Sequence, residues 1–126
     1  MTIVLDASAL LALLFDEPGG EAVAAHARGA ILSAVNLDEI LHKCARRGIA
    51  RDVVLSAVRR LEVAVHAFDA DQAIASAGLH AIARPLGLSF ADRACLALAQ
   101  RLAVPVLTAD HAWAGLDVGI DIRLIR

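Results

Sequence analysis

The chain has 126 residues, of which 59 % are hydrophobic and 21 % charged, and its formal net charge is −2. This composition excludes an intrinsically disordered chain and fits a single domain spanning residues 1–126. The longest apolar run, Ala9–Phe15, is much shorter than the roughly 18 residues that a membrane span requires. The first residues contain Asp6 and no Lys or Arg, so they do not resemble a signal peptide, and we expect a cytoplasmic protein.

Short apolar runs alternate with helical patterns along the chain. In order, the patterns predict a strand at 3–5, helices at 8–16 and 21–28, a strand at 30–33, helices at 37–48 and 53–61, a strand at 63–65, helices at 70–84 and 89–103, and strands at 104–108 and 120–125, the last at a sheet edge. Strands separated by helices form right-handed crossovers. The predicted fold class is therefore α/β, a three-layer α/β/α sandwich with a mostly parallel central sheet.

Four acidic residues occur where a ligand binds in such a sheet. Asp6 and Asp110 follow the first and fourth predicted strands, whereas Glu39 and Asp92 are expected in the first turns of helices. The carboxyl ends of parallel strands share one edge, so we expect all four side chains to lie there.

Each acid also has a purely structural explanation. Asp6 and Asp110 suit helix caps, and the pairs Asn36/Glu39 and Ser89/Asp92 have the spacing of capping boxes or close relatives of it. Grouped carboxylates, however, repel by roughly 4 kcal/mol per close pair at an effective dielectric near 20. This repulsion favours a bound cation.

The residue types indicate which cation it is. Cys44 and Cys95 are far apart and the five histidines lack ligand spacing, so neither type predicts a metal site. An all-oxygen ligand set suits Mg²⁺ or Mn²⁺, and such an ion suits phosphodiester hydrolysis. Ser8 and Thr108 each stand two residues from an acid, where their hydroxyls could orient a carboxylate or a bound water, or simply cap the backbone.

Four segments containing these acids resemble the PIN-domain ribonucleases, and more closely the VapC-type toxins of bacterial toxin–antitoxin pairs. They are Val4-Leu5-Asp6-Ala7-Ser8-Ala9, Asn36-Leu37-Asp38-Glu39, Leu88-Ser89-Phe90-Ala91-Asp92-Arg93 and Leu107-Thr108-Ala109-Asp110. The resemblance implies an endoribonuclease dependent on Mg²⁺ or Mn²⁺ that cuts structured RNA of the tRNA or ribosomal RNA class. It further implies a homodimer, a small inhibitory antitoxin partner, a metal-binding set of Asp6, Glu39, Asp92 and Asp110, and supporting roles for Ser8 and Thr108.

RNA contacts are expected from basic residues, because the chain has no Tyr and only four aromatic side chains. Lys43, Arg46, Arg47 and Arg51 cluster around one helix end, and Arg93 is adjacent to Asp92; of these, Lys43, Arg46 and Arg93 are the candidate RNA contacts. A solvated face with a favourable interaction with the C-terminal helix dipole also explains the cluster, and for any single residue it is the preferred explanation. Asp117 suits a solvated turn, and Asp38 points about 100° away from Glu39, so neither is placed in the metal site.

Two other functions fit parts of the pattern. A catalytically silent PIN-fold module that binds RNA or protein would use the same fold without turnover. A haloacid-dehalogenase-like phosphotransferase also places an Asp after its first strand. That class needs a second Asp near the first and a Lys after a later strand, whereas the only lysine here, Lys43, lies in a predicted helix. The sequence therefore favours the nuclease.

Overall fold

Five short strands form an all-parallel sheet in the computed structural model, which describes residues 2–126. The strands are β1 (Val4–Leu5), β2 (Ile31–Ser33), β3 (Ala64–His66), β4 (Val106–Thr108) and β5 (Ile122–Leu124). Their order in the sheet is β3-β2-β1-β4-β5. The predicted α/β sandwich is confirmed, and β5 lies at an edge as expected.

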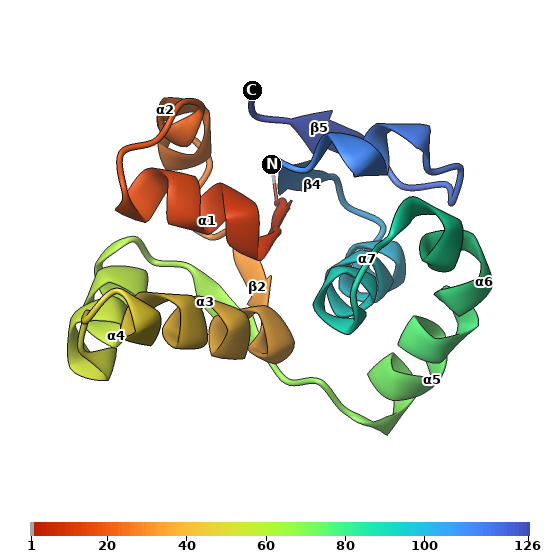
Figure 1. Cartoon of the computed structure of the whole chain (residues 1–126), viewed down its shortest axis with the longest axis horizontal. Coiled ribbons are helices and arrows are strands. Elements are labelled where there is room, and N and C mark those ends of the chain that lie inside the picture. The colour runs from red at the N-terminus through yellow and green to blue at the C-terminus, as the bar shows by residue number, and fades with distance from the viewer. Residues whose placement is uncertain (1) are drawn as a thin grey trace.

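Helices cover both faces of this sheet. One side carries α1 (Ala7–Leu14), α2 (Gly20–Ala24), α3 (Ala34–Arg46) and α4 (Arg51–Arg60), and the other carries α5 (Ala70–Gly78), α6 (His80–Ala83) and α7 (Phe90–Leu102) (Figure 1). Two 3₁₀ segments, η1 (Arg84–Leu86) and η2 (His111–Gly115), complete this second side. No helix among residues 2–126 is long and apolar enough to cross a membrane.

The two faces bury alternate residues of the strands. Ile3 and Leu5 pack into the core beneath α1–α4, whereas Val4 packs into the core beneath α7, and all three side chains are fully buried. This alternation is the period of two that a strand imposes on its side chains. Both helical layers thus rest on apolar surface, and the buried polar side chains of the strands, Ser33 and Thr108, lie at strand ends.

Two sequence predictions about helices were wrong. The helix expected at 70–84 is divided into α5, α6 and η1, because Gly78 is a weak helix former and Pro85 lacks the N–H that a continuous helix needs. The helix expected from Leu37 begins at Ala34, where the Ser33 hydroxyl accepts a hydrogen bond from the N–H of Val35 at 3.2 Å. Glu39 consequently lies in the second turn of α3 rather than the first.

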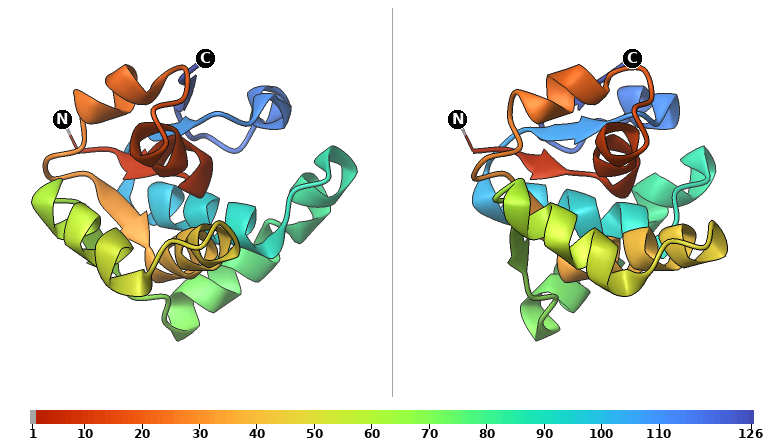
Figure 2. Two further views of the ribbon diagram at one scale, coloured as in Figure 1. Left: turned by 60° about the vertical axis from the view of Figure 1, so that its left-hand side comes forward. Right: turned by 90° about the vertical axis from the view of Figure 1, so that its left-hand side faces the viewer.

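The parallel topology brings the carboxyl ends of the strands to one edge. There β1 leads into α1, β2 into α3 and β4 into η2, and Figure 2 shows β1 and β4 side by side. The helix α7 precedes β4 and runs antiparallel to the strands, so its first turn lies at the same edge. This edge holds the candidate site.

Candidate functional site

Asp6 is the buried centre of the acidic edge. It ends β1, caps α1 and is only 3 % exposed. Its Oδ1 accepts a hydrogen bond from the N–H of Ala7 at 2.9 Å, and its Oδ2 accepts hydrogen bonds from the hydroxyls of Ser8 at 2.6 Å and Thr108 at 2.8 Å. The carboxylate therefore has one fixed orientation, set by residues of β4 as well as α1.

The same two hydroxyls connect Asp6 to the loop that carries Asp110. Ser8 Oγ accepts a hydrogen bond from the N–H of Ala109 at 2.9 Å, and Thr108 Oγ1 accepts one from the N–H of Asp110 at 3.0 Å. Each hydroxyl thus orients the Asp6 carboxylate and also accepts a hydrogen bond from a backbone N–H. The sequence left these two roles as alternatives. A hydroxyl has one donor and two acceptor positions, so one group can do both.

Glu39 reaches the site from the middle of α3. Its Oε1 is buried without a hydrogen-bond partner among residues 2–126, whereas its Oε2 lies 3.3 Å from Lys43 Nζ. The capping box expected for Asn36 and Glu39 is wrong, since Ser33 caps the helix. The amide of Asn36 instead donates to the carbonyl of Ala91 at 3.1 Å, which holds α3 against the first turn of α7.

Asp92 and Asp110 both act as helix caps, as the sequence suggested. The Oδ2 of Asp92 accepts a hydrogen bond from the N–H of Ser89 at 2.8 Å, and Ser89 Oγ accepts one from the N–H of Asp92 at 3.2 Å, which completes a capping box. Asp110 caps η2 by accepting a hydrogen bond from the N–H of Ala112 on its Oδ1 at 2.9 Å. Capping engages one oxygen of each carboxylate, so the other oxygen remains to bind a ligand.

The four acids influence one another electrostatically. Burial raises the pKa of Asp6 to about 6, the hydrogen bonds from Ser8 and Thr108 oppose this rise, and the charges of Asp92 and Glu39 add to it. Burial also raises the pKa of Asp92, and the charges of Glu39 and Asp110 raise it further. Negative charge is therefore concentrated at this edge of the sheet, as the sequence predicted.

A hard divalent cation fits these residues. Among residues 2–126, no group of three or more His, Cys, Asp or Glu side chains is arranged to hold one metal ion. Mg²⁺ does not require that, because it keeps several waters and is commonly held by only one or two carboxylates. The all-oxygen donors, their mutual repulsion and the buried, unpartnered Glu39 Oε1 all suit such an ion.

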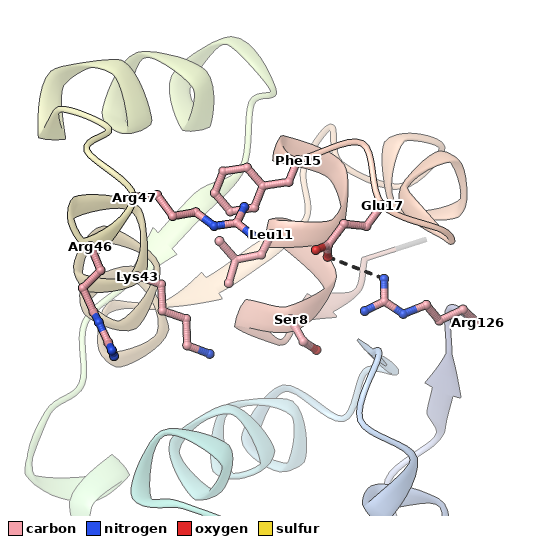
Figure 3. A pocket seen from close by; sticks show the side chains of 8 residues that line it. All are labelled: Ser8, Leu11, Phe15, Glu17, Lys43, Arg46, Arg47 and Arg126. Atoms are coloured by element: carbon pink, nitrogen blue, oxygen red, sulfur yellow. Dashed lines mark ion pairs between the residues drawn. The ribbon is translucent and has the colours of Figure 1, made fainter.

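A basic groove of about 460 Å³ lies beside α1 and α3 (Figure 3). It connects to the acids through Ser8, which contacts Asp6, and through Lys43, which contacts Glu39. Its lining is apolar at Leu11 and Phe15 and polar or charged at Ser8, Glu17, Lys43, Arg46, Arg47 and Arg126. Three of the four cations are already engaged, because Lys43 lies 3.3 Å from Glu39, Arg126 lies 3.5 Å from Glu17 and the Arg47 guanidinium lies 4.1 Å from the centroid of the Phe15 ring. Lys43 and Arg46 both line this groove, whereas Arg51 lies on α4 beside Asp52.

The remaining sequence candidates lie elsewhere. Arg93 is on α7, where its Nη1 donates a hydrogen bond to His80 Nδ1 at 3.3 Å, so it does not join the basic groove. Asp38 is exposed on α3 and Asp117 is exposed in the loop after η2. Arg126 was not predicted, because its position at the groove depends on how the last strand pairs, which no local pattern indicates.

Comparisons with known proteins agree with this fold. A model of the PIN domain matches residues 3–118. The comparison with curated proteins gives no match. The toxin–antitoxin complex from Klebsiella pneumoniae has a chain with a TM-score of 0.79 and 17 % identity, covering 98 % of this chain and 98 % of that chain.

Two further solved structures have the same architecture. DNA-bound VapBC from Salmonella typhimurium has a chain with a TM-score of 0.74 and 17 % identity, covering 100 % of this chain and 99 % of that one. A sarcin-ricin-loop-cleaving VapC toxin from Mycobacterium tuberculosis has a TM-score of 0.64 and 21 % identity, covering 94 % and 98 %. The TM-scores establish a shared fold with these three structures. The PIN domain model covers most of the sequence. The chain therefore belongs to the PIN domain family.

Proposed function

We propose that this protein is a metal-dependent endoribonuclease, the toxin of a toxin–antitoxin pair. The observation that carries the proposal is the group of four acids at one sheet edge, which includes a buried Asp6 with a pKa of about 6 and an unpartnered Glu39 oxygen. Natural folds avoid such concentrated charge unless a cation offsets it. In this proposal Asp6, Glu39, Asp92 and Asp110 would hold Mg²⁺ or Mn²⁺.

A bound ion and the side chains around it would have different tasks in phosphodiester hydrolysis. A bound divalent ion would lower the pKa of a water and offset the charge that develops on the phosphate. Ser8 and Thr108 keep Asp6 in one orientation, and Asn36 holds α3, which carries Glu39, against the first turn of α7, which carries Asp92.

The basic groove supports RNA as the substrate. Lys43 and Arg46 line the groove, and so does Ser8, which contacts Asp6. Guanidinium and ammonium groups bind backbone phosphates, so an RNA strand lying in the groove would bring a phosphodiester bond to the acids. The Mycobacterium tuberculosis toxin that shares this fold cleaves the sarcin-ricin loop, which supports a structured RNA target of the ribosomal or tRNA class for this chain.

Partners are proposed on two grounds. The structural relatives from Klebsiella pneumoniae and Salmonella typhimurium are toxin–antitoxin or VapBC complexes, which supports a cognate antitoxin for this chain. Large apolar side chains are exposed on α5 and α6, including Ile74 at 72 % and Ile82 at 46 %. Such exposed apolar groups favour a protein partner, and we propose a homodimer.

Cleavage of a mixed tRNA and ribosomal RNA pool tests the activity. We expect discrete fragments with Mg²⁺ or Mn²⁺ and none with EDTA, measured on denaturing gels. If RNA binds to the folded protein and stays intact with every metal and every RNA in the pool, the nuclease proposal fails. The silent PIN-fold binding module would then be the better description.

The groove makes a separate prediction about binding. Replacing Arg46 with glutamine is expected to lower RNA affinity about threefold to tenfold and to reduce the slope of log affinity against log salt by about 0.7, the contribution of one phosphate contact on a single strand. The measurement is a salt titration of RNA binding in EDTA, which prevents cleavage. The control is Arg59→Gln, because Arg59 is an exposed arginine of α4 outside the groove. Equal slopes for the two variants would contradict the groove as the RNA path.

A further inference from the structure

We infer that a cavity between α5 and α7 binds one nucleobase, through the side-chain amide of Gln72 and the paired side chains of Asp69 and Arg101. The cavity has a volume of about 350 Å³, which is within the range of small-molecule sites. Its lining comes from the end of β3, the start of α5 and the second half of α7, and includes His66, Asp69, Gln72, Leu98, Arg101 and Leu102. An RNA source for the base rests on the proposed function, whereas binding of a free nucleoside does not.

The side chain of Gln72 is buried at this cavity without a partner. The residue is 3 % exposed, and among residues 2–126 its side-chain amide forms no hydrogen bond. A glutamine at this position of a helix often accepts a hydrogen bond from the cap residue's N–H, but here only the backbone N–H of Gln72 bonds to Asp69, at 2.9 Å. A buried amide without partners costs free energy, and a ligand in the cavity would supply them.

Asp69 and Arg101 add an acceptor and a donor whose charges offset each other. Arg101 Nη1 lies 3.5 Å from Asp69 Oδ2, and both side chains are about half exposed. The backbone N–H of Gln72 and the charge of Arg101 hold the pKa of Asp69 below its ordinary value, so the carboxylate stays charged. An anion in the cavity would meet this carboxylate and a cation would meet the guanidinium, so the pair favours a neutral ligand.

A nucleobase matches this arrangement. It is neutral and planar, and its edges present hydrogen-bond donors beside acceptors. An amide offers the same combination in one group, and a carboxylate next to a guanidinium offers it in two. The apolar side chains of Leu98 and Leu102 provide contact for the faces of the ring. Proteins recognise single-stranded RNA in this way, by hydrogen bonds to the edges of bases that are turned out of the stack.

The cavity is separate from the acidic site but is built on neighbouring segments. His66 ends β3 and pairs in register with Ser33, which caps α3. Leu98 and Arg101 follow Asp92 along α7 by six and nine residues, which corresponds to roughly 9 and 14 Å along the helix axis. A base bound here would therefore belong to a nucleotide other than the one whose phosphodiester bond lies at the acids.

Titration with uncharged nucleosides, in EDTA and without RNA, tests the cavity directly. We expect at least one of adenosine, guanosine, cytidine and uridine to shift the backbone amide NMR signals of Gln72 and Arg101, with a dissociation constant of roughly 0.1 to 1 mM. Gln72→Met keeps the side-chain length without the amide, so binding should weaken by about tenfold or more while the melting temperature does not fall. Gln100→Met is the matched control, because Gln100 is exposed on α7 outside this cavity, and it should bind as wild type does.

A short unstructured RNA in EDTA identifies the source of the base. Shifts of the same two signals by this RNA, with weaker binding in Gln72→Met, would support the inference with RNA as the source, and shifts by nucleosides alone would support it with a free nucleotide as the source. The inference is overturned if no nucleoside shifts these signals, if Gln72→Met binds as tightly as wild type, or if inorganic phosphate alone shifts them. No arm requires metal or cleavage, so failure of the nuclease proposal would leave the nucleoside result unchanged.

Discussion

Replacing Asp6 with asparagine is expected to lower RNA cleavage by about a thousandfold or more while leaving the protein folded. A metal ion contributes several kcal/mol of transition-state stabilisation, and each 1.4 kcal/mol corresponds to about tenfold in rate. Asparagine has nearly the same shape but lacks the charge that holds the ion. Cleavage of an RNA oligonucleotide in Mn²⁺ under single-turnover conditions measures the loss.

Stability distinguishes this loss from misfolding. The folded protein raises the pKa of Asp6 to about 6, so at pH 7 the charged carboxylate lowers the free energy of unfolding. Asp6→Asn removes this destabilising charge, but its NH2 group cannot accept the hydrogen bonds that an Asp6 oxygen accepts from Ser8 and Thr108. Without metal we therefore expect its free energy of unfolding at pH 7 to stay within about 2 kcal/mol of wild type, measured by denaturant unfolding. Asp38→Asn is the control, because Asp38 is exposed on α3 and is expected to change neither quantity. An Asp6→Asn variant that is folded and fully active would contradict the role of Asp6.

Local sequence patterns predicted the parts of the site that local structure determines. Short apolar runs located β1 and β4, and therefore placed Asp6 and Asp110 at one edge. The Ser89–Asp92 spacing predicted the start of α7 because a capping box lies within a single turn. The same reasoning failed for Asn36 and Glu39, since the last residue of β2, Ser33, is also the cap of α3.

Contacts between distant segments could not be predicted in this way. The hydrogen bond from Asn36 to Ala91 brings Glu39 toward Asp92, and it depends on how α3 and α7 pack. Arg126 reaches the basic groove only because β5 pairs with β4 in its particular register. The Phe68–Phe90 contact likewise joins a loop after β3 to the start of α7. Sequence spacing contains no information on such packing.

The free energy of unfolding without metal is expected to depend strongly on pH because of Asp6. The pKa of Asp6 is about 6 in the folded protein against an ordinary value of 3.8, so between these values the folded state binds more protons than the unfolded state. The free energy of unfolding without metal should consequently fall by about 2 kcal/mol as pH rises from about 4 to 6, and the total loss should approach about 3 kcal/mol above pH 7. The raised pKa of Asp92 acts in the same direction.

Urea unfolding in EDTA across this pH range measures the effect. The free energy of unfolding of Asp6→Asn should decrease clearly less over this pH range, because the asparagine side chain does not titrate. Saturating Mn²⁺ should raise stability most at pH 7, where the carboxylates are charged, by about 2.7 kcal/mol at a hundred times the dissociation constant. The free energy of unfolding in EDTA could instead rise from pH 4 to 6 in both wild type and Asp6→Asn. That result would contradict the charge arrangement described for this site.

The most direct test of the metal-binding acids is a calorimetric titration with Mn²⁺ at pH 7. Wild type and Asp38→Asn should bind Mn²⁺ with the same affinity, whereas Asp92→Asn, which retains an oxygen to accept the cap hydrogen bond from Ser89, should bind it at least tenfold more weakly. Equal Mn²⁺ affinity in wild type and a folded Asp92→Asn, or no binding by wild type, would contradict the account of a metal-dependent nuclease built on these acids.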